Sequence, residues 1–555
     1  MATPFSLRRD LRGAGRWTAW ASAAATVLWA AGCTPGGFSK KQAVGGELQF
    51  RYAMHASPTT LDPGKVQDVD TSDLLQNIYQ GLVAYDDKNE IVPVLAESWT
   101  VEDGGKRYRF RLRGGLKFHS GRAVKASDVV YSLNRHVDPK FGSPTAGYLS
   151  DIVGYADVLA GKATVLKGLS APNDSEVVID LDAPRPYFLG KLTYPCAFVV
   201  NPERAKGEIT VETRADGTGP YRLRAYAKDQ EVLLEAFDGT VGGRPPTGVL
   251  VRPIIKDAAT RLLKYRNGEL DILTLERQDM AAVEKDAKLR ADVVEVPRPV
   301  IYYLGMNQAR FAPFRDARVR RAFMLGINRK KIAEDVIGLP YAKGFVPPGV
   351  TGHRADLAGV PFDPSAARRL LAEAGYPEGH NFPALTITYR EGRPDSQLLA
   401  VSAVTDLKKN LGINVSARAM EWRSFLEARN AKQLQFVGLS WYADYLDPEN
   451  FLSFLMRSDA SENRDGYANP EFDALCRQAD VEMDPSKRTS LYHQAEDILL
   501  EDAARIPVYY GRDILLVSPR VSGLRTNLFG TMPHATVTVS ARNGSGAGSD
   551  GSEKP

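Results

Sequence analysis

Short strand patterns alternate with amphipathic helix patterns through most of this chain, between about residues 47 and 538. The stretch "ELQFRYAM" (47–54) is typical of a strand, whereas "KASDVVYSLNRHV" (125–137) carries apolar residues at helical spacing. With 555 residues, the chain is also longer than one hydrophobic core usually takes. We therefore expect an α/β protein built in several lobes.

Three further helices and a hairpin are expected from local patterns. Apolar periodicity and helix-ending glycines predict helices over residues 73–86, 316–338 and 363–377. The stretch "SWTVEDGGKRYRFRLR" (98–113) has a Gly-Gly turn followed by strict alternation of basic and apolar residues. This combination predicts a β-hairpin.

Charge and motif content exclude several function classes. The formal net charge is +4, and the leader at residues 1–32 supplies three of these charges, so the body is close to neutral and lacks a nucleic-acid footprint. The seven histidines are widely spaced, without a zinc-ligand pattern, and no Gly-Lys pair precedes Ser or Thr as in a phosphate-binding loop. We expect no metal, no cofactor and no nucleic-acid partner.

The first 32 residues are typical of an export signal. The basic stretch "SLRRDLRGAGR" precedes the apolar "WTAWASAAATVLWAAG", which is too short and too often interrupted for a membrane span. Its end, "AAGC", resembles a bacterial lipoprotein box in which Cys33 is lipidated, although Ala30 stands where Leu is usual. Arg8-Arg9 fits either a twin-arginine signal or an ordinary basic region.

Two polar segments flank the body. Residues 33–46 are expected to tether it to a membrane, and residues 539–555 have the composition of a disordered tail. Besides Cys33, only Cys196 and Cys476 occur. An exported chain of this length can bury enough core without a bridge, so both are interpreted as small buried hydrophobes.

An acidic residue follows the strand pattern "LQFVGLSWY" (434–442) after a single alanine. A carboxylate at the end of a buried strand is costly unless it is paired. Asp444 is therefore either a structural residue of the turn before Asp447-Pro448 or a charge that pairs with a cationic ligand. The residues alone leave both readings open.

A set of motifs resembles the family 5 extracellular solute-binding proteins, the oligopeptide-, dipeptide- and nickel-binding components of ABC importers. The longest is "LAESWTVEDGGKRYRFRLRGGLKFHSGRAVKASDVVYSL", and the others follow in one collinear order: "GTGPYRL", "RLLKYRNGELDI", "FRDARVRRAFMLGINRKKI", "VPPG", "FDPSAARRLLAEAGYP", "WYADYLDPENFL", "YANPEFDAL" and "IPVYY". The resemblance implies two hinged lobes, the first with an extra subdomain, that enclose a ligand when they close.

The resemblance also implies a division of the body. The first lobe would comprise residues 47–83 and 214–299, with the extra subdomain at 84–213 and a return segment at 511–538. The second lobe would comprise residues 300–510. His119, inside the hairpin signature, is expected to be structural.

By the same resemblance, the ligand site lies around the strand that ends before Asp444. In the peptide-binding members the equivalent Asp pairs with the peptide's N-terminal ammonium, and Trp441 would supply an apolar wall. Ser440 to Tyr442 would pair with the peptide backbone. A second exposed strand segment would lie at Gln67–Val69, the alternative being a plain surface loop.

Two further residues match contact positions of the family. Arg429 resembles a contact on the carboxylate side of the peptide, the alternative being a solvated charge. A second Arg of some oligopeptide binders is replaced by Gly438, which puts the recognition of the C-terminus in doubt. Tyr148 resembles a cleft-facing Tyr of the extra subdomain, with core packing as the alternative.

The hypothesis is a non-enzymatic, exported, monomeric binding protein of the periplasm or cell envelope, anchored by lipid at Cys33. It would capture a short peptide and deliver it to an ABC permease and its ATPase. The alternatives are a non-peptide solute (metal chelate, haem, opine or sugar), a secreted hydrolase using Asp444 and Asp447, and a scaffold with an empty cleft.

Overall fold

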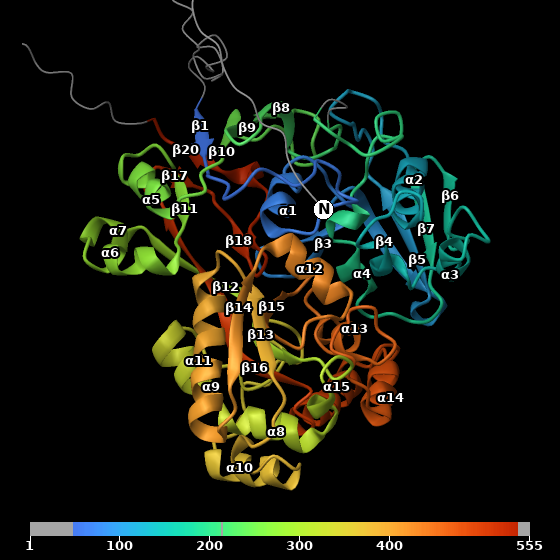
Figure 1. The fold of residues 1–555 in the computed structure, drawn as a ribbon. Coiled ribbons are helices and arrows are strands. Elements are labelled where there is room, and N and C mark those ends of the chain that lie inside the picture. The colour runs from blue at the N-terminus through green and yellow to red at the C-terminus, as the bar shows by residue number, and fades with distance from the viewer. Residues whose placement is uncertain (1–47, 212–214, 542–555) are drawn as a thin grey trace, which may run out of the picture. The chain divides into compact units, whose positions relative to one another are not determined.

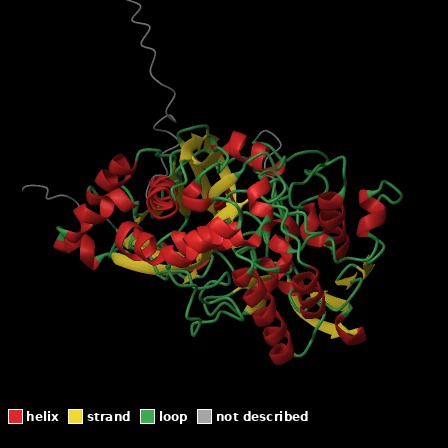
Figure 2. Cartoon of the chain, turned by 60° about the horizontal axis from the view of Figure 1, so that its bottom comes forward, coloured by secondary structure: helices red, strands yellow, loops and turns green. Residues whose placement is uncertain are grey.

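The computed structural model describes residues 48–211 and 215–541, and its helices and strands are interleaved along the chain (Figures 1 and 2). The expected α/β fold with two lobes is confirmed. The export signal, Cys33 and residues 542–555 of the expected tail lie outside the described residues. The tail was expected to begin at residue 539, but Val539 is a buried strand residue. Within the described ranges, every helix is too short or too polar to cross a membrane.

Two four-stranded sheets build the first lobe. One has the order β1-β10-β9-β8, with β1 parallel to β10 and the other pairs antiparallel. The other is antiparallel with the order β4-β5-β7-β6. Their strands are β1 (Gln49–Arg51), β4 (Ala96–Glu102), β5 (Arg107–Leu112), β6 (Leu169–Asn173), β7 (Glu176–Asp180), β8 (Tyr221–Ala227), β9 (Glu231–Ala236) and β10 (Val249–Pro253).

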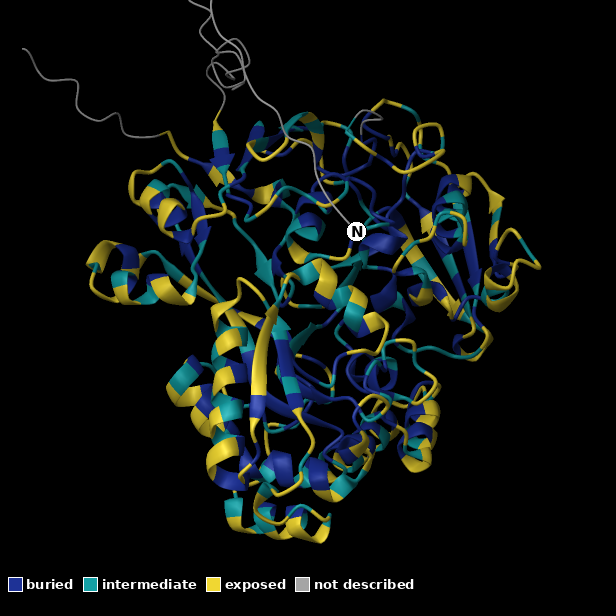
Figure 3. Cartoon of the chain, viewed as in Figure 1, coloured by how far each residue is buried: buried dark blue, intermediate teal, exposed yellow. Residues whose placement is uncertain are grey.

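A six-stranded mixed sheet of order β11-β16-β12-β15-β13-β14 runs through both lobes. Its β11 end belongs to the first lobe, where Ile272 bridges to Tyr52, and the β15, β13 and β14 side belongs to the second. Strand β14 forms one edge, and most of its residues are exposed (Figure 3). The strands are β11 (Ile272–Thr274), β12 (Val293–Met306), β13 (Leu385–Arg390), β14 (Val415–Met420), β15 (Phe436–Tyr442) and β16 (Arg505–Val517).

Helices cover both faces of this sheet. Alternate residues of β12 point to opposite sides, so Leu304 packs with α8, α10 and α11, whereas Tyr303 packs with α13, α14 and α15. These helices span Ala317–Gly326 (α8), Pro364–Glu373 (α10), Pro394–Leu411 (α11), Ser453–Met456 (α13), Pro470–Ala479 (α14) and Pro485–Glu501 (α15).

The remaining elements are short. The helices are α1 (Val69–Leu75), α2 (Ala126–Val137), α3 (Tyr155–Leu159), α4 (Phe188–Lys191), α5 (Ala258–Arg266), α6 (Met280–Glu284), α7 (Ala287–Ala291), α9 (Arg329–Lys331) and α12 (Trp422–Asn430). The strands β2 (Val83–Tyr85) and β3 (Ile91–Pro93) form an antiparallel hairpin, as do β18 (Thr526–Asn527) and β19 (Gly530–Thr531). Strand β17 (Val521–Ser522) pairs with β20 (Thr538–Val539).

Two long antiparallel strands, β12 and β16, connect the lobes. Their pairing is regular at Val293–Pro297 and resumes at Ile301, with one register shift between Pro297 and Ile301 and a second between Tyr302 and Tyr303. Pro297 and Pro299 lie at the first shift and lack the N–H that a ladder needs. Beyond it, β15 joins β12 only from Val300 onward. The two prolines therefore place irregular backbone at the point where the chain passes between the lobes.

The helix expected over residues 73–86 was wrong, because α1 ends at Leu75. The carbonyls of Asn77 and Ile78 accept hydrogen bonds from the backbone N–H groups of Tyr221 and Gly219. A Cβ at Gly219 would lie 2.5 Å from the carbonyl oxygen of Asn77, so this close approach requires glycine. Tertiary backbone pairing therefore replaces the local helix.

The long helix expected over residues 316–338 is interrupted. Helix α8 ends at Gly326, Ile327 is extended, and the side chain of Asn328 accepts a hydrogen bond from the Lys331 N–H to begin α9. The expected hairpin at β4 and β5 and the helices α2 and α10 are confirmed. Cys196 and Cys476 are free and buried, as expected.

A buried ion pair joins β16 to the 457–467 loop. Removing its acidic partner measures how much this pair contributes to the stability of the fold. Arg505, at the start of β16, is 2% exposed, pairs with Asp465 and lies 4.7 Å from the ring centre of Tyr303. We expect Asp465→Ala to lower the free energy of unfolding by about 3–5 kcal/mol, because it leaves a buried guanidinium unpaired.

Urea denaturation of the purified body measures this effect. Glu97→Ala is the matched control, because its partner Arg111 is three-quarters exposed. Its effect should be below about 1 kcal/mol. Equal losses in the two variants would contradict the prediction.

Candidate functional site between the lobes

One edge of β15 is open at its C-terminal end. On one side, the whole length of β15 pairs with β12. On the other side, β13 pairs with it only from Phe436 to Gly438, and then stays with β14. From Leu439 to Tyr442 the strand therefore has a free edge among the described residues.

The backbone groups at that free edge belong to Ser440 and Tyr442. The Ala443 N–H donates to the Pro299 carbonyl at 2.8 Å, so it points toward β12. Hydrogen-bonding direction alternates along an antiparallel strand, so Ser440 and Tyr442 direct their N–H and C=O groups to the opposite side. A ligand in extended conformation could pair there.

The carboxylate of Asp444 lies just beyond this edge. It accepts a hydrogen bond from the hydroxyl of Tyr148, which comes from the helical turn Ala146–Leu149 of the first lobe. Asn450 fixes the turn, because its Oδ1 accepts from the Asp444 N–H at 3.1 Å and from the Trp441 Nε1 at 3.0 Å. Tyr148 and Asp444 are thus brought together across the two lobes.

Burial raises the pKa of Asp444 to about 7. The hydrogen bond from Tyr148 and the nearby side-chain amide of Asn450 lower it, and the charge of Glu462 raises it further. The described residues place no cation in an ion pair with Asp444. The carboxylate is therefore held in a setting where a positively charged ligand would stabilise its ionised form.

Aromatic rings surround this carboxylate. Tyr148 stacks on Tyr194, with ring centres 4.7 Å apart, and meets Phe454 edge-on at 5.4 Å. Trp441 lies 5.8 Å from Phe454 on the other side. These rings form an apolar wall made by both lobes, next to the open edge of β15.

Comparisons with known proteins agree with this architecture. The bacterial extracellular solute-binding proteins of family 5 (middle region) match residues 90–463. The chain belongs to this family.

Two curated relatives from Escherichia coli show how broad the similarity is. The probable deoxycholate-binding periplasmic protein YgiS is 34% identical over 85% of this chain and 90% of its own length. The periplasmic oligopeptide-binding protein OppA is 33% identical over 84% of this chain and 87% of its own length.

Two solved structures share the fold. OppA of Haemophilus influenzae, in complex with the peptide RPPGFSPFR, has a TM-score of 0.78 at 25% identity, covering 89% of this chain and 99% of its own. The murein tripeptide-binding protein MppA of Escherichia coli has a TM-score of 0.79 at 26% identity, with the same coverage. The family and these neighbours are binding proteins.

In this solute-binding protein Arg429 is not a solvated charge, so the alternative interpretation given for this residue was wrong. It lies in the last turn of α12, is buried, and its Nη1 contacts Glu462 at 3.4 Å. Its Nη2 is buried and has no hydrogen-bond partner in the described part of the chain. A role as a ligand contact stays a prediction.

The exposed strand predicted at Gln67–Val69 was wrong. Asp68 is extended, but its carboxylate accepts a hydrogen bond from the Thr71 N–H and caps α1, so Val69 is already helical. Gln67 and Val69 are exposed. Whether they contact a ligand stays a prediction.

The turn that carries Asp444 is also bonded to the first lobe by other residues. The Leu446 N–H donates to the Tyr85 hydroxyl at 3.1 Å, and Tyr445 stacks on Tyr187 with ring centres 6.2 Å apart. Burial raises the pKa of Glu449 to about 7, and the nearby ammonium of Lys191 lowers it. The turn that holds Asp444 is therefore also fixed by several other contacts between the lobes.

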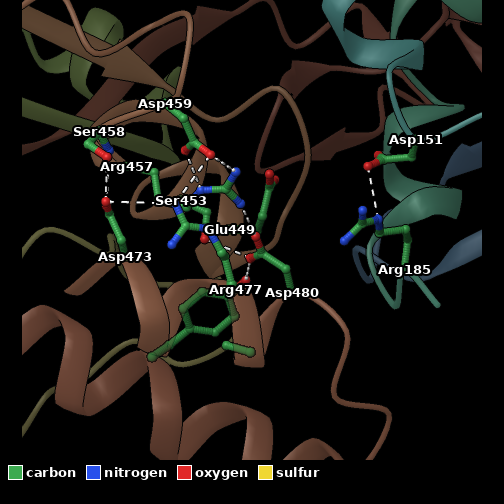
Figure 4. Close-up of polar contacts among 12 residues, drawn as sticks. Asp151, Arg185, Glu449, Ser453, Arg457, Ser458, Asp459, Asp473, Arg477 and Asp480 are labelled. Atoms are coloured by element: carbon green, nitrogen blue, oxygen red, sulfur yellow. Dashed lines mark hydrogen bonds and ion pairs between the residues drawn. The ribbon is translucent and has the colours of Figure 1, made fainter. Parts of the chain in front are cut away.

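Buried charges on each side of this contact are satisfied locally (Figure 4). In the first lobe, Asp151 pairs with Arg185 at 3.0 Å and with Lys191 at 2.6 Å. In the second lobe, Asp480 pairs with Arg457 at 2.9 Å. These pairs fix the loops around the site.

Asp447 is not available as a second catalytic carboxylate. Both of its oxygens accept hydrogen bonds from Arg488, at 2.8 and 2.6 Å. His119 is structural, as expected: its Nδ1 accepts from the Gly217 N–H, and its Nε2 lies 3.0 Å from the Gly219 carbonyl oxygen. The hydrolase alternative therefore gains no support from the geometry.

Sequence reasoning missed Asn450 and Tyr194. Asn450 stands six residues after Asp444 in "DPENF", a spacing that a turn allows but that no helix or strand period indicates. Tyr194 precedes Pro195 in a loop and lies far from Asp444 in sequence. Only the packing of the two lobes brings it to the site.

The raised pKa of Asp444 gives a pH-dependent stability. The folded protein binds this proton more tightly than the unfolded chain, so the stabilisation is present at low pH and is lost as pH rises from about 4 to about 7. We expect Asp444→Asn to remove this slope. Urea unfolding between pH 4 and 8 measures it, and an unchanged slope in Asp444→Asn would contradict it.

Proposed function

We propose that the protein is the substrate-binding component of an ABC importer and captures a short peptide between its lobes. One observation carries the proposal: the open edge of β15 ends beside Asp444, a carboxylate that no cation neutralises within the described residues and that Tyr148 reaches from the other lobe. The site is thus suited to a ligand that has both an extended backbone and a positively charged group.

The backbone groups of Ser440 and Tyr442 would pair with the ligand. Main-chain hydrogen bonds are shared by all peptides, so an open edge gives affinity without selecting a sequence. Side chains of the ligand would alternate in direction and meet the wall of Trp441, Phe454 and Tyr194.

The carboxylate of Asp444 would pair with the ligand's N-terminal ammonium. In a closed site such a charge-assisted contact is stronger than a surface pair, because water does not screen it. Tyr148 would keep its hydrogen bond to the same carboxylate, so ligand and protein would together join the lobes.

A second candidate ligand is a bile acid such as deoxycholate, favoured by the 34% identity to YgiS. The support for peptides is the unpaired carboxylate, because deoxycholate is itself an anion and brings no ammonium. Relatives named for oligopeptides and for a murein tripeptide agree with the peptide proposal.

The proposal includes the route to the importer. Residues 1–32 would direct export, Cys33 would carry a lipid anchor, and residues 33–46 would let the monomeric body reach the permease and its ATPase in the periplasm or cell envelope. The lobe boundaries near residues 300 and 510, with the extra subdomain at 84–213, belong to the same proposal. The crossing of β12 and β16 supports them. No enzymatic step is proposed.

Native mass spectrometry of the purified body, followed by calorimetry with the peptides that it releases, tests the function. We expect Asp444→Asn to weaken binding of a free tripeptide at least tenfold, because it removes the partner of the ammonium. Asp459→Asn, which changes a half-exposed carboxylate outside the site, is the control.

An N-acetylated tripeptide should bind Asp444→Asn and the unaltered protein almost equally. Release of a single non-peptide species instead, with no peptide bound, would overturn the peptide proposal.

Peptide affinity should also depend on pH. An ammonium pairs only with the ionised form of Asp444, so below pH 7 binding must displace a proton and affinity should fall by up to about tenfold per pH unit. Above about pH 8 the ligand's own amine loses its charge. Calorimetry from pH 5.5 to 8.5 should show a maximum near pH 7–8, and Asp444→Asn should lose the acid limb. A flat profile would contradict it.

A further inference from the structure

A methionine of the second lobe lies against a glycine of the first. Met483 is in the loop between α14 and α15, and Gly105 is in the turn Asp103–Gly105 of the β4–β5 hairpin. A Cβ placed on Gly105 would lie 3.1 Å from both the Sδ and the Cε atoms of Met483, and 3.3 Å from the Cβ of Pro184. The thioether therefore occupies the space beside Gly105 where a side chain would stand.

The backbone of Gly105 suits this contact. Its φ of +97° is a left-handed conformation that favours glycine. Asp103 and Gly104, which precede it in the turn, are exposed, whereas Gly105 is buried. Since the side chains of Met483 and Pro184 are the groups nearest its bare face, the second lobe helps to bury this part of the hairpin.

The loop that carries Met483 is held at both ends. At its start, Asp480 pairs with Arg457 at 2.9 Å (Figure 4). At its end, the carboxylate of Asp484 accepts a hydrogen bond from the Lys487 N–H at 2.8 Å and caps α15. A short loop fixed in this way loses little conformational freedom when Met483 meets the first lobe.

The contact lies away from the strands that connect the lobes. Figure 1 shows α14 and the β4–β5 hairpin on one side of the molecule, whereas β11 and the crossing of β12 and β16 lie toward the other side. A rotation about the irregular stretch at Pro297 and Pro299 would thus separate Met483 from Gly105. The contact can form only when the lobes are close, so it stabilises the closed arrangement relative to the open one.

Met483 is also accessible to solvent. Its exposed fraction is 46%, and among the methionines of the described residues it alone is exposed. The others are buried (Met54, Met306, Met324 and Met456) or half-buried (Met280, Met420 and Met532). An oxidant must reach the sulfur from solvent, so Met483 is the described methionine that an oxidant reaches first.

We propose that Met483 is a modification site, at which oxidation by a hydroperoxide weakens closure of the lobes and releases the ligand faster. The inference rests on the proposed function, because it concerns how long a bound peptide is retained. In the reaction the sulfur lone pair attacks one oxygen of hydrogen peroxide, and the O–O bond breaks. The leaving hydroxide takes the proton of the transferred oxygen and departs as water. The sulfur is oxidised by two electrons to a sulfoxide, and the peroxide is reduced.

The sulfoxide changes the contact in polarity and in size. A thioether is apolar and packs well against Gly105 and Pro184, whereas the oxygen of a sulfoxide is a hydrogen-bond acceptor that water solvates in the open arrangement. Closing the lobes would then remove water from a polar group. The added oxygen also needs room beside Gly105, where the sulfur is already in close contact. Both effects favour the open arrangement.

The test treats the purified protein with limiting hydrogen peroxide and locates the added oxygen by peptide mass spectrometry. Stopped-flow tryptophan fluorescence then measures the release of Ala-Ala-Ala before and after treatment. We expect Met483 to be oxidised at least fivefold faster than any half-buried methionine. The oxidised protein should release the tripeptide at least threefold faster, with its association rate changed less than twofold. Methionine sulfoxide reductases should restore the original rate.

Three variants separate this site from the other methionines. Met483→Leu keeps an apolar side chain of similar size without sulfur, so its release rate should match that of the unaltered protein and should not respond to peroxide. Met280→Leu changes a half-buried methionine of α6 in the first lobe, and it is the control that should keep the response. Met483→Gln places a polar group at the contact and should release the tripeptide faster without peroxide. Circular dichroism verifies that each variant is folded.

Three results would overturn the inference: faster oxidation of another methionine, an unchanged release rate after oxidation of Met483, or an equal response in Met483→Leu. If the unaltered protein binds no peptide, the proposed function falls, and small-angle X-ray scattering of the empty protein decides whether Met483 controls closure. A larger radius of gyration after oxidation, absent in Met483→Leu, would support that control. An unchanged radius would overturn it.

Discussion

The pairing of β12 with two partners is the constraint on which the rest of the structure depends. One partner, β16, accompanies it from lobe to lobe, and the other, β15, carries the candidate site. The prolines at positions 297 and 299 interrupt the first pairing just where the second begins. A rotation of the lobes about this irregular stretch would leave β15 firmly attached to β12, so the site edge would keep its shape while its surroundings move.

Topology and burial together set the chemistry of the site. Asp444 follows the end of β15 by two residues, so the strand fixes where its carboxylate lies. Several contacts of the Asp444 turn, including those of Tyr148, Tyr85 and Tyr187, come from the other lobe. An ionised Asp444 without a cation is costly in this aromatic setting, which explains why burial dominates its pKa.

Much of the fold could be predicted from local patterns, and the failures have a common cause. The alternation in "RYRFRL" and the apolar strand "LQFVGLSWY" predicted β5 and β15, because burial on a sheet face has a short period. The helix expected at 73–86 failed because Gly219 lets a distant strand approach Asn77 and Ile78. Such long-range pairing leaves no local signal.

The site was also predicted only in part, because some of its features depend on residues that are distant in sequence. The position of Asp444 after a strand could be inferred from its neighbours in sequence. Its bond to Tyr148 was not predicted, because the resemblance implied only that Tyr148 faces the cleft. The free edge of β15 depends on where β13 turns away, which no motif encodes.

The shared oxygen of Asn450 has a consequence for engineering the specificity of this protein. The indole N–H of Trp441 and the backbone N–H of Asp444 both donate to it, so the wall of the site and its carboxylate are held by one atom. A library that varies position 441 to admit new side chains would also loosen the charged end of the site. Side chains at position 441 that place an N–H or O–H donor where the indole N–H lies would allow the wall to be redesigned without moving the carboxylate.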